Sequence, residues 1–576
     1  MSRRSPSGRF TDTSEVNPLA LLAVLGAAVA GAGFVWLAVL VDAVRTGRPR
    51  PAHPLLLLAH LRQGLTPWPS PVGWAVAALV YVLLGGLLGG IGLRVWRRFG
   101  RRAEVDRRVR HLADHADRQA LSPQARRQQA KRIAPVVLVL DGPPGTVLGR
   151  EVGSGQPVLA GWEDVQVQIW GPRRGKTTTQ AVPSLLAAPG PAIATSNKRD
   201  LLDASAGMRA KRGRVWVFDP QGVAGTLQPA FCFNPLTTVR AAVQAQRLAA
   251  LFVADTREPG ARTDPQWDTA GADLLAWLML AAAADQRPLG DVWSWVTDPE
   301  DRTPITILRR HGHDGPALSV QGVQQQPDKM RGSVYGTAQR MARPLINPQL
   351  LAWVTPTAGL PAFDPERFVS SKDTLYALSR EGAGSAGAIV TALTSAVCEA
   401  AEQKAIANLD RSGRLAVPLV CVLDEAANVC RWPELPALYS HYGSRGINLI
   451  TFLQSYAQGV SVWGQDGMAT LWSAATIRIY GGGVADQRWL SELSDLIGDH
   501  DETHRSITHR RGERSVSVDV RQRRTITAAQ LAALPRDRII LFAGSKPLVL
   551  EPQPWYTGDQ ADEINAAREA WAAQHD

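Results

Sequence analysis

The residues best suited to chemistry lie in one short segment, where Gly175, Lys176 and Thr177 follow each other directly. An apolar run at 165–170 precedes this segment and a helical pattern follows it, which is the context that a phosphate-binding loop requires. In such a loop backbone N–H groups cradle phosphates, the lysine adds charge beside the β and γ phosphates, and the threonine hydroxyl ligates Mg²⁺. The expected ATP-binding residues are Gly171, Pro172, Arg173, Arg174, Gly175, Lys176, Thr177 and Thr178, with Thr177 also on Mg²⁺.

The loop departs from the common GxxxxGK[ST] pattern at its first position. Counting back from Lys176, Trp170 occupies the place of the first glycine, and Gly171 comes one residue later. Either the loop is one residue shorter, or its first turn is built differently. A chance Gly-Lys-Thr in an ordinary loop is the alternative to a nucleotide site, and the flanking strand and helix patterns count against it.

Two further apolar runs end in polar residues that would complete such a site. The run 418–423 leads into Asp424 and Glu425. Asp424 is expected to hold the Mg²⁺ shell and Glu425 to polarise the attacking water as general base, although in isolation such a pair is also a common helix cap. The run 449–453 leads into Gln454, at the kind of strand end where open α/β sheets bind ligands. Gln454 is therefore a catalytic candidate, with a plain surface amide as the equal alternative.

Short apolar runs alternate with longer helical patterns after residue 145, which is typical of a doubly wound α/β sheet covered on both faces. Strands are expected at 165–170, 192–195, 215–218, 374–378, 419–423, 448–452, 476–480 and 539–542. Between about 237 and 355 the strand patterns vanish and helical patterns dominate. The expected fold is a RecA-like P-loop nucleotide-binding domain with an all-α domain inserted into it.

Two segments near the N-terminus, 16–41 and 71–93, contain no charged residue. Each is long enough to cross the roughly 30 Å of hydrocarbon in a bilayer as a helix. A cleaved signal peptide is an alternative for the first segment, because Arg3, Arg4 and Arg9 precede it, and buried helices of a soluble core are an alternative for both. Two transmembrane helices are therefore expected ahead of the α/β domain.

Arginine counts set the orientation of these spans. The segment 94–110 is far denser in arginine than the loop 42–70, so residues 94–576 and the N-terminus are expected in the cytoplasm. Most of the arginines in 94–110 are expected to contact lipid headgroups rather than DNA. The expected parts are a cytoplasmic tail (1–15), a two-span anchor in the cell membrane (16–93) with an outer loop (42–70), a basic juxtamembrane stalk (94–150), a P-loop ATPase domain (151–236 and 356–557), the inserted all-α domain (237–355) and a C-terminal tail (558–576).

The composition of the chain narrows the class of partner. The 63 Lys and Arg residues against 52 Asp and Glu residues give a formal net charge of +11, which favours polyanions such as nucleic acid or anionic lipid without choosing between them. The 4 cysteines form no close CxxC pair and have no matching histidines, which argues against a zinc site or a disulfide framework.

Several segments, in the same order and spacing, resemble the type IV secretion coupling proteins of the TraG/TraD group, relatives of the FtsK and HerA hexameric motors. The resemblance extends over most of residues 160–556 and includes the phosphate loop and the segments 182–186, 217–220, 233–236, 423–426, 442–455, 463–464, 493–498 and 531–556. The segment 196–201 departs from the Asp-x-Lys-Gly-Glu/Asp-Leu pattern of the family, because Ser196 replaces its Asp and Arg199 replaces its Gly.

The resemblance implies a homo-hexameric ring that hydrolyses ATP with Mg²⁺ and feeds relaxase-linked DNA into a membrane secretion channel. It also implies that Arg445 reaches the nucleotide of a neighbouring subunit as an arginine finger, with a surface arginine paired to a carboxylate or phosphate as the alternative. The helical insertion and the N-terminal spans match the domain plan of the family.

Sequence-independent DNA binding requires cations that follow the phosphate backbone. The strongest candidates lie in one polar stretch, for which a solvated loop or hairpin is the alternative: Arg505, Arg510, Arg511, Arg514, Arg521, Arg523 and Arg524. Two rival functions stay open. One is a chromosome or protein translocase on the same scaffold, and the other is a membrane receptor that docks substrates while its ATPase is weak or lost, which Trp170 in the loop would explain.

Overall fold

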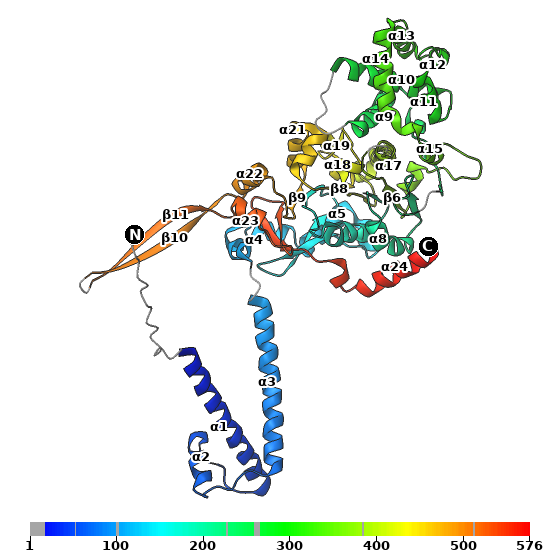
Figure 1. The fold of residues 1–576 in the computed structure, drawn as a ribbon. Coiled ribbons are helices and arrows are strands. Elements are labelled where there is room, and N and C mark those ends of the chain that lie inside the picture. The colour runs from blue at the N-terminus through cyan, green and yellow to red at the C-terminus, as the bar shows by residue number, and fades with distance from the viewer. Residues whose placement is uncertain are drawn as a thin grey trace, which may run out of the picture. The chain divides into compact units, whose positions relative to one another are not determined.

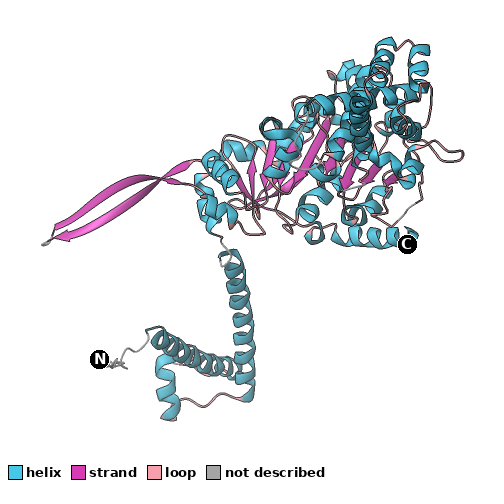
Figure 2. Ribbon diagram, turned by 45° about the horizontal axis from the view of Figure 1, so that its top comes forward, coloured by secondary structure: helices cyan, strands magenta, loops and turns pink. Residues whose placement is uncertain are grey.

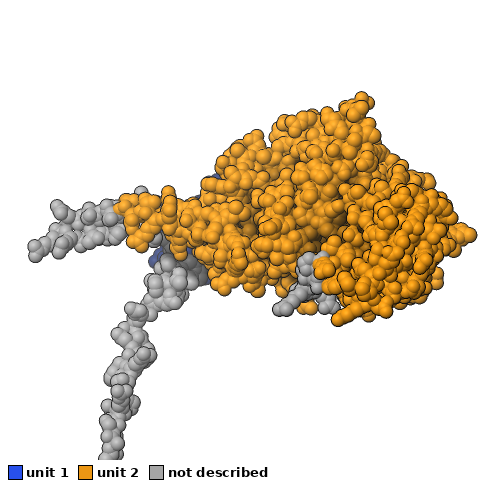
Figure 3. All heavy atoms as spheres, turned by 90° about the horizontal axis from the view of Figure 1, so that it is seen from above, with its two compact units in different colours: residues 1–102 blue, residues 103–576 orange. Residues whose placement is uncertain are grey.

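The computed structural model describes residues 18–51, 53–99, 103–225, 228–257, 265–382, 385–510 and 513–575. The chain divides into two compact units, residues 1–102 and residues 103–576 (Figure 3). Among the described residues, the first unit contains helices and the second contains helices and two sheets.

The first unit pairs two long helices, α1 (Pro18–Thr46) and α3 (Pro71–Phe99), with α2 (Pro54–Arg62) in the connection between them. Phe34 of α1 packs edge-on against Tyr81 of α3, with ring centroids 5.1 Å apart, and the Tyr81 hydroxyl donates to the backbone oxygen of Ala30 at 2.9 Å. Before α3 begins, the Ser70 hydroxyl donates to Asp42 at 2.6 Å. These contacts hold the two helices side by side.

Among the described residues, one helix is long and apolar enough to cross a membrane, through the stretch Val29–Thr46, whereas the apolar stretch of α3, Pro71–Leu87, is shorter. The prediction of two spans is therefore supported for the first segment only. Helix α3 itself continues to Phe99 and so includes Arg94, Arg97 and Arg98.

The second unit is built around an 11-stranded sheet with the order β2-β1-β13-β12-β9-β3-β8-β7-β4-β6-β5 (Figure 2). From β9 to β5 all neighbouring strands are parallel, and β12, β13, β1 and β2 extend the sheet in antiparallel fashion. Every strand expected from the sequence is present: β3 (Gln166–Ile169), β4 (Ala192–Ser196), β5 (Val215–Phe218), β6 (Thr374–Leu378), β7 (Leu419–Leu423), β8 (Ile447–Leu453), β9 (Ile477–Tyr480) and β12 (Ile539–Phe542).

Helices bury both faces of the parallel strands. In β8, Leu449 and Leu453 face one core, to which α17 (Gly387–Ala407) contributes, while Ile450 and Phe452 face the other, to which α7 (Val182–Ala187) and α8 (Asp200–Ala210) contribute. Because both faces are covered, strands such as β7 and β8 are nearly continuous apolar runs, whereas β3 buries Gln166 and Gln168 between its apolar residues. The predicted α/β sheet is confirmed.

The sequence patterns do not predict three strands of this sheet: β1 (Gly145–Glu151), β2 (Pro157–Gly161) and β13 (Leu548–Glu551). Ahead of β1, the turn η1 (Glu104–His111) is fixed by Asp106, which receives two hydrogen bonds from Arg538, at 2.8 and 2.9 Å. Both charges are buried, so the pair anchors this segment to the strand that follows Arg538. Residues 103–151 therefore belong to the second unit, which differs from the basic stalk expected over 94–150.

The end of the chain also differs from the expected tail over 558–576, because α24 (Ala561–His575) packs on α8. Ile564 and Ala567 bury themselves against Met208, and a Cβ at Gly207 would lie 2.1 Å from the backbone oxygen of Ala567. Only glycine allows this close approach of the two helices.

Between β5 and β6 the chain forms the helices α9 (Ala242–Thr256), α10 (Pro265–Ala284), α11 (Leu289–Thr297), α12 (Thr303–Arg310), α13 (Asp314–Gln324), α14 (Asp328–Met341) and α15 (Pro348–Val354), and Figure 1 shows them gathered at one end of the second unit. The end of α9 is tied to the sheet, because Asp255 accepts the Ser385 hydroxyl at 2.8 Å and Arg431 donates to the backbone oxygen of Asp255 at 3.3 Å. Burial raises the pKa of Asp255.

Candidate nucleotide site

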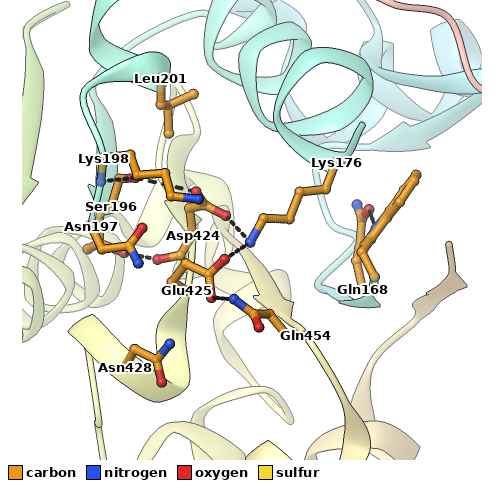
Figure 4. A network of polar contacts seen from close by, with 12 residues as sticks. Gln168, Lys176, Ser196, Asn197, Lys198, Leu201, Asp424, Glu425, Asn428 and Gln454 are labelled. Atoms are coloured by element: carbon orange, nitrogen blue, oxygen red, sulfur yellow. Dashed lines mark hydrogen bonds and ion pairs between the residues drawn. The ribbon is translucent and has the colours of Figure 1, made fainter. Parts of the chain in front are cut away.

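The carboxyl ends of adjacent strands bring the expected site residues together (Figure 4). β3 runs into the phosphate loop, β7 ends just before Asp424 and Glu425, and β8 ends just before Gln454. Because β3, β8 and β7 are parallel neighbours, these three ends meet at one edge of the sheet. The structure thus assembles the loop lysine, both carboxylates and the glutamine in one place.

Lys176 occupies the centre of this arrangement. Its Nζ lies 3.0 Å from Asp424 Oδ1 and also contacts Glu425 Oε1. The lysine side chain is 15% exposed and each carboxylate 4%, so water screens these attractions weakly. Burial lowers the pKa of Lys176, but the two carboxylates outweigh it and raise that pKa above its ordinary value. The lysine therefore carries a permanent positive charge at the position where phosphates would bind.

The backbone at Glu425 has a left-handed conformation, with φ of 52°, between β7 and α18 (Ala426–Val429). Side chains other than glycine rarely adopt this conformation, and it is retained where the surrounding structure enforces it. In this turn Glu425 uses Oε1 on Lys176 and receives the Gln454 Nε2 donor on Oε2 at 2.9 Å. The carboxylate is thus held from both sides, with the geometry that a positioned general base needs.

Asp424 is 3% exposed, and burial raises its pKa although Lys176 opposes the effect. Its Oδ2 accepts the Ser196 hydroxyl at 3.4 Å, whereas its buried Oδ1 has Lys176 as ion-pair partner but no hydrogen bond of good geometry among the described residues. A buried carboxylate oxygen without a hydrogen bond fits a place beside a cation or its water shell.

The donor set fits Mg²⁺ delivered together with a nucleotide. Thr177 opens the π-helical turn Thr177–Ala181 directly after Lys176, so its hydroxyl and the carboxylate of Asp424 are the protein oxygens that would hold the ion. Within the described residues no three His, Cys, Asp or Glu side chains gather into a metal site. Mg²⁺ at nucleotide sites takes one or two protein ligands and fills its shell with phosphate and water oxygens.

Backbone conformation shapes the loop itself. Gly175 has φ of +86° and Arg173 has φ of +56°, so the chain turns sharply just before the lysine. The hydroxyls of Thr178 and Thr179 donate to the backbone oxygen of Gly175, at 3.1 and 2.9 Å. The Thr178 hydroxyl is therefore used in a hydrogen bond within the loop, and the backbone N–H of Thr178 is the group that can bind a phosphate.

The side chain of Arg174 holds the loop in place. Its guanidinium donates to the backbone oxygens of Gly481, Leu534 and Pro535, at 3.0, 2.8 and 2.7 Å. Burial lowers the pKa of Arg174, and the three carbonyls compensate the buried cation. The side chain thus fastens the loop to the segments after β9 and before β12, and only the backbone of Arg174 is available to a nucleotide.

Trp170, the irregular first residue of the loop, is fully buried. Its ring Nε1 donates to Gln168 Oε1 at 3.0 Å. A Cβ on Gly481 would lie 2.1 Å from the indole ring, so the glycine opposite provides the room that the tryptophan fills. Next to it, Gly171 donates to the backbone oxygen of Gly482 at 2.9 Å. The first turn is therefore built differently, by packing into a glycine segment, and the second of the two alternatives left open by the sequence is correct.

Sequence reasoning missed a polar network at the same strand ends. Gln458 Oε1 accepts the backbone N–H of Gln454 at 2.9 Å, and Gln458 Nε2 donates to Asn428 at 2.9 Å. Asn428 and Asn197 both donate to Glu381, and Ser196 donates to Asp424 as described. The sequence signal was weak but present, because each of these residues ends a strand or follows the end of one by at most 5 residues.

Arg445 lies away from this constellation. It ends the short helix α20 (Tyr442–Arg445) and precedes β8, so it lies at the amino end of a strand whose carboxyl end carries Gln454. Its Nε lies 3.5 Å from Glu402 Oε1. Within its own chain Arg445 thus has the carboxylate partner that the sequence left as the alternative, and a contact with nucleotide requires a second subunit.

The comparisons with known proteins agree with this geometry. Residues 418–536, which begin at the strand before Asp424 and include Gln454, match the family model described as "TraM recognition site of TraD and TraG". Over these residues, called the TraG/TraD segment below, the chain is similar to that family. The predicted resemblance is confirmed, whereas a search of the curated proteins finds no match.

Solved structures of a coupling protein share the fold of this chain. The bacterial conjugative coupling protein TrwBdeltaN70, in an unbound form, is 16% identical, with a TM-score of 0.51 over 69% of this chain and 87% of the other. The plasmid coupling protein TrwB in complex with ADP and Mg²⁺ is 17% identical, with a TM-score of 0.50 over 69% and 88% of the two chains. At these identities the likeness establishes the fold.

The TraG/TraD segment includes the arginine-rich stretch, which forms a two-stranded ribbon of β10 (Asp499–Arg510) and β11 (Glu513–Arg524). The ribbon projects from the second unit in Figure 2. Its described arginines pair with carboxylates: Arg521 with Asp519, Arg523 with Glu502, and Arg524 with Asp495 and Asp499. Arg511 lies outside the described residues, as do the side chains of Arg505, Arg510 and Arg514. The stretch is thus a hairpin, and binding of DNA by its arginines stays a prediction.

Proposed function

We propose that this chain is a membrane-anchored ATPase that couples ATP hydrolysis to the sequence-independent movement of relaxase-bound DNA into a secretion or conjugation channel. The observation that carries the proposal is the convergence of Lys176, Asp424, Glu425 and Gln454 at adjacent strand ends, in the order that a P-loop motor requires. The TraG/TraD segment and the TrwB-like fold support the conjugative role.

In the proposed reaction Glu425 accepts a proton from the attacking water, and the bond between the β,γ-bridging oxygen and the γ-phosphorus breaks to release ADP and phosphate. Lys176 moves from its two carboxylate partners to the phosphates, because the phosphates carry negative charge as the carboxylates do. Gln454 keeps Glu425 oriented through the 2.9 Å hydrogen bond, so that the base faces one direction while the lysine moves. Bound Mg²⁺ would neutralise phosphate charge, held by Thr177 and Asp424.

Arg445 is proposed to complete the site of a neighbouring subunit in a homo-hexamer. Arg445 and Glu425 lie at opposite edges of the sheet, so Arg445 does not reach the nucleotide site of its own chain. The Arg445 side chain is 30% exposed and could face a second copy of the chain. The contact with Glu402 would hold the guanidinium in place until a phosphate replaces the carboxylate.

The membrane location is proposed from the first unit. The stretch Val29–Thr46 supports one span, and α3 with its short apolar stretch is proposed as the second, with both termini in the cytoplasm. Contact with channel proteins would follow from this location. The net charge of +11 suits a DNA cargo followed along its phosphates.

The test is ATP hydrolysis by the full chain with single-stranded and double-stranded DNA of arbitrary sequence. We expect DNA to stimulate hydrolysis, and we expect Lys176→Ala and Glu425→Gln each to lower the rate at least 100-fold. Lys329→Ala, an exposed lysine of α14, is the matched control and should keep the wild-type rate. Absence of hydrolysis with both DNAs, or rates unchanged in the two site variants, would contradict the motor and favour a substrate-docking receptor.

Subunit mixing tests the arginine finger. Lys176→Ala and Arg445→Ala chains are each expected to be inactive alone, and a mixture should recover activity because some interfaces then carry an intact arginine and an intact lysine. No recovery on mixing, with both variants still assembling, would place Arg445 outside the reaction.

A further inference from the structure

Helix α5 (Pro123–Ile133) uses its two faces differently. Its inner face packs on β2, where Arg126 pairs with Asp164 at 2.9 Å and both side chains are 11% exposed. Its outer face exposes three cations that have no ion pair or hydrogen bond within the described residues: Arg127, Lys131 and Arg132. The charge of the inner face is thus compensated inside the protein, and the charge of the outer face is not.

The short helix α6 (Pro135–Val139) follows directly and ends in two exposed apolar side chains. Val139 is 81% exposed and Leu140 54%, whereas Val137, one turn away from them, is fully buried. The turn is fixed, because the Gly142 N–H donates to the backbone oxygen of Val137 at 2.8 Å and Asp141 takes the left-handed conformation. Val139 and Leu140 are therefore held in solvent by a closed turn.

Exposed cations next to a fixed apolar tip are the combination that binds the surface of an anionic bilayer, where cations contact headgroups and apolar side chains enter the interface. Residues 122–141 contain 4 cations, counting Arg126, against the single carboxylate of Asp141. Bound DNA would use the cations but would leave Val139 and Leu140 in water. The apolar tip therefore favours lipid over nucleic acid as the partner of this surface.

We propose that the outer face of α5 and the tip of α6 form a docking surface for anionic lipid headgroups, which holds the second unit against the membrane in addition to the N-terminal helices. The inference rests on the membrane anchoring proposed above. Docking by this surface depends on lipid charge, because each Lys or Arg near an anionic surface strengthens binding about fivefold. Anchoring by the N-terminal helices does not, because an apolar helix inserts into neutral and anionic bilayers alike.

The experiment places a fluorescent probe at the tip of α6. The 4 native cysteines are all buried, so a thiol-reactive probe on Val139→Cys labels this position selectively. The full chain is reconstituted in nanodiscs of phosphatidylcholine alone or with 30% phosphatidylglycerol, each containing spin-labelled lipid as quencher. A probe on Leu318→Cys, an exposed apolar position of α13, is the matched control.

We expect the probe at 139 to be quenched in the anionic nanodiscs at least threefold more than in the neutral ones, and the probe at 318 to be equally quenched in both. The triple variant Arg127→Gln, Lys131→Gln, Arg132→Gln should abolish the difference. Equal quenching at 139 in both lipids would overturn the proposal, as would protection of the probe by DNA or by a second copy of the chain without lipid. Migration of the chain with the nanodiscs reports on the N-terminal anchor separately, so failure of anchoring and failure of this surface give different results.

Discussion

Replacing Trp170 by glycine gives the phosphate loop its consensus first residue, yet the structure predicts that this change weakens the loop. The indole is fully buried against Gly481 and donates a hydrogen bond to Gln168, so Trp170→Gly leaves a cavity the size of the ring. Loss of a buried aromatic side chain costs about 3–5 kcal/mol, and the unpaired buried Gln168 oxygen adds about 1–3 kcal/mol. The sum is a large part of the roughly 5–15 kcal/mol that stabilises a typical domain.

Two assays separate stability from binding. Chemical denaturation followed by circular dichroism should show a clear drop in the denaturant midpoint of Trp170→Gly, and a fluorescent ATP analogue should bind at least tenfold more weakly. Trp170→Phe is the matched control, because it keeps most of the ring volume and loses mainly the hydrogen bond to Gln168, at a cost of about 1–2 kcal/mol.

A sequence pattern considered alone makes the opposite prediction, that glycine repairs an irregular loop and tightens binding. If Trp170→Gly unfolds at the wild-type denaturant concentration and binds the analogue as tightly as wild type or more so, the packing explanation of this loop is refuted.

Three further changes test other contacts. Gln454→Ala should lower the turnover number of ATP hydrolysis about tenfold or more with little change in KM, because the change releases Glu425 without altering the phosphate loop. A tenfold rise in KM with an unchanged turnover number would contradict this prediction. Arg538→Ala should destabilise the chain by about 3–5 kcal/mol, since it leaves Asp106 buried and unpaired, and Arg538→Ala with Asp106→Asn should recover part of the loss in the same denaturation assay. Burial raises the pKa of Asp255 in the folded chain above the ordinary pKa that it has in the unfolded chain. Between these two pKa values the folded chain holds a proton that the unfolded chain has released. The free energy of unfolding should therefore fall as pH rises through that window. Asp255→Asn should flatten this dependence in unfolding measured from the ordinary pKa of an aspartate upward, and an unchanged slope would exclude the group.

The strands and the site lysine could be predicted because their signals are local. A continuous apolar run such as that of β7 predicts a strand buried on both faces, and Gly-Lys-Thr after a strand predicts a phosphate loop, so Lys176, Asp424, Glu425 and Gln454 could be proposed as site candidates from the sequence. Three strands were missed for different reasons: β1 and β2 carry glycine or proline, which are depleted in strands, and β13 is only 4 residues long.

The role of each loop side chain depends on segments far away in the chain. Arg174 and Trp170 are the clearest cases, since one bonds carbonyls near Leu534 and the other fills space opposite Gly481. No spacing rule connects residues about 300 positions apart, and their contact follows from β9 lying beside β3. The contacts of the Arg174 side chain could therefore not be predicted from the loop pattern.

The sequence by itself determined which residues carry charged and amide groups and that they follow strands, because residue type and periodicity are properties of a single segment. The tertiary structure alone decided which of these residues meet. The order of β3, β8 and β7 in the sheet places Gln454 on Glu425 and Lys176 between two carboxylates, whereas the same strands in another order would have left those side chains apart. Strand order is fixed by the packing of the whole sheet against its helices, and no single segment contains that information.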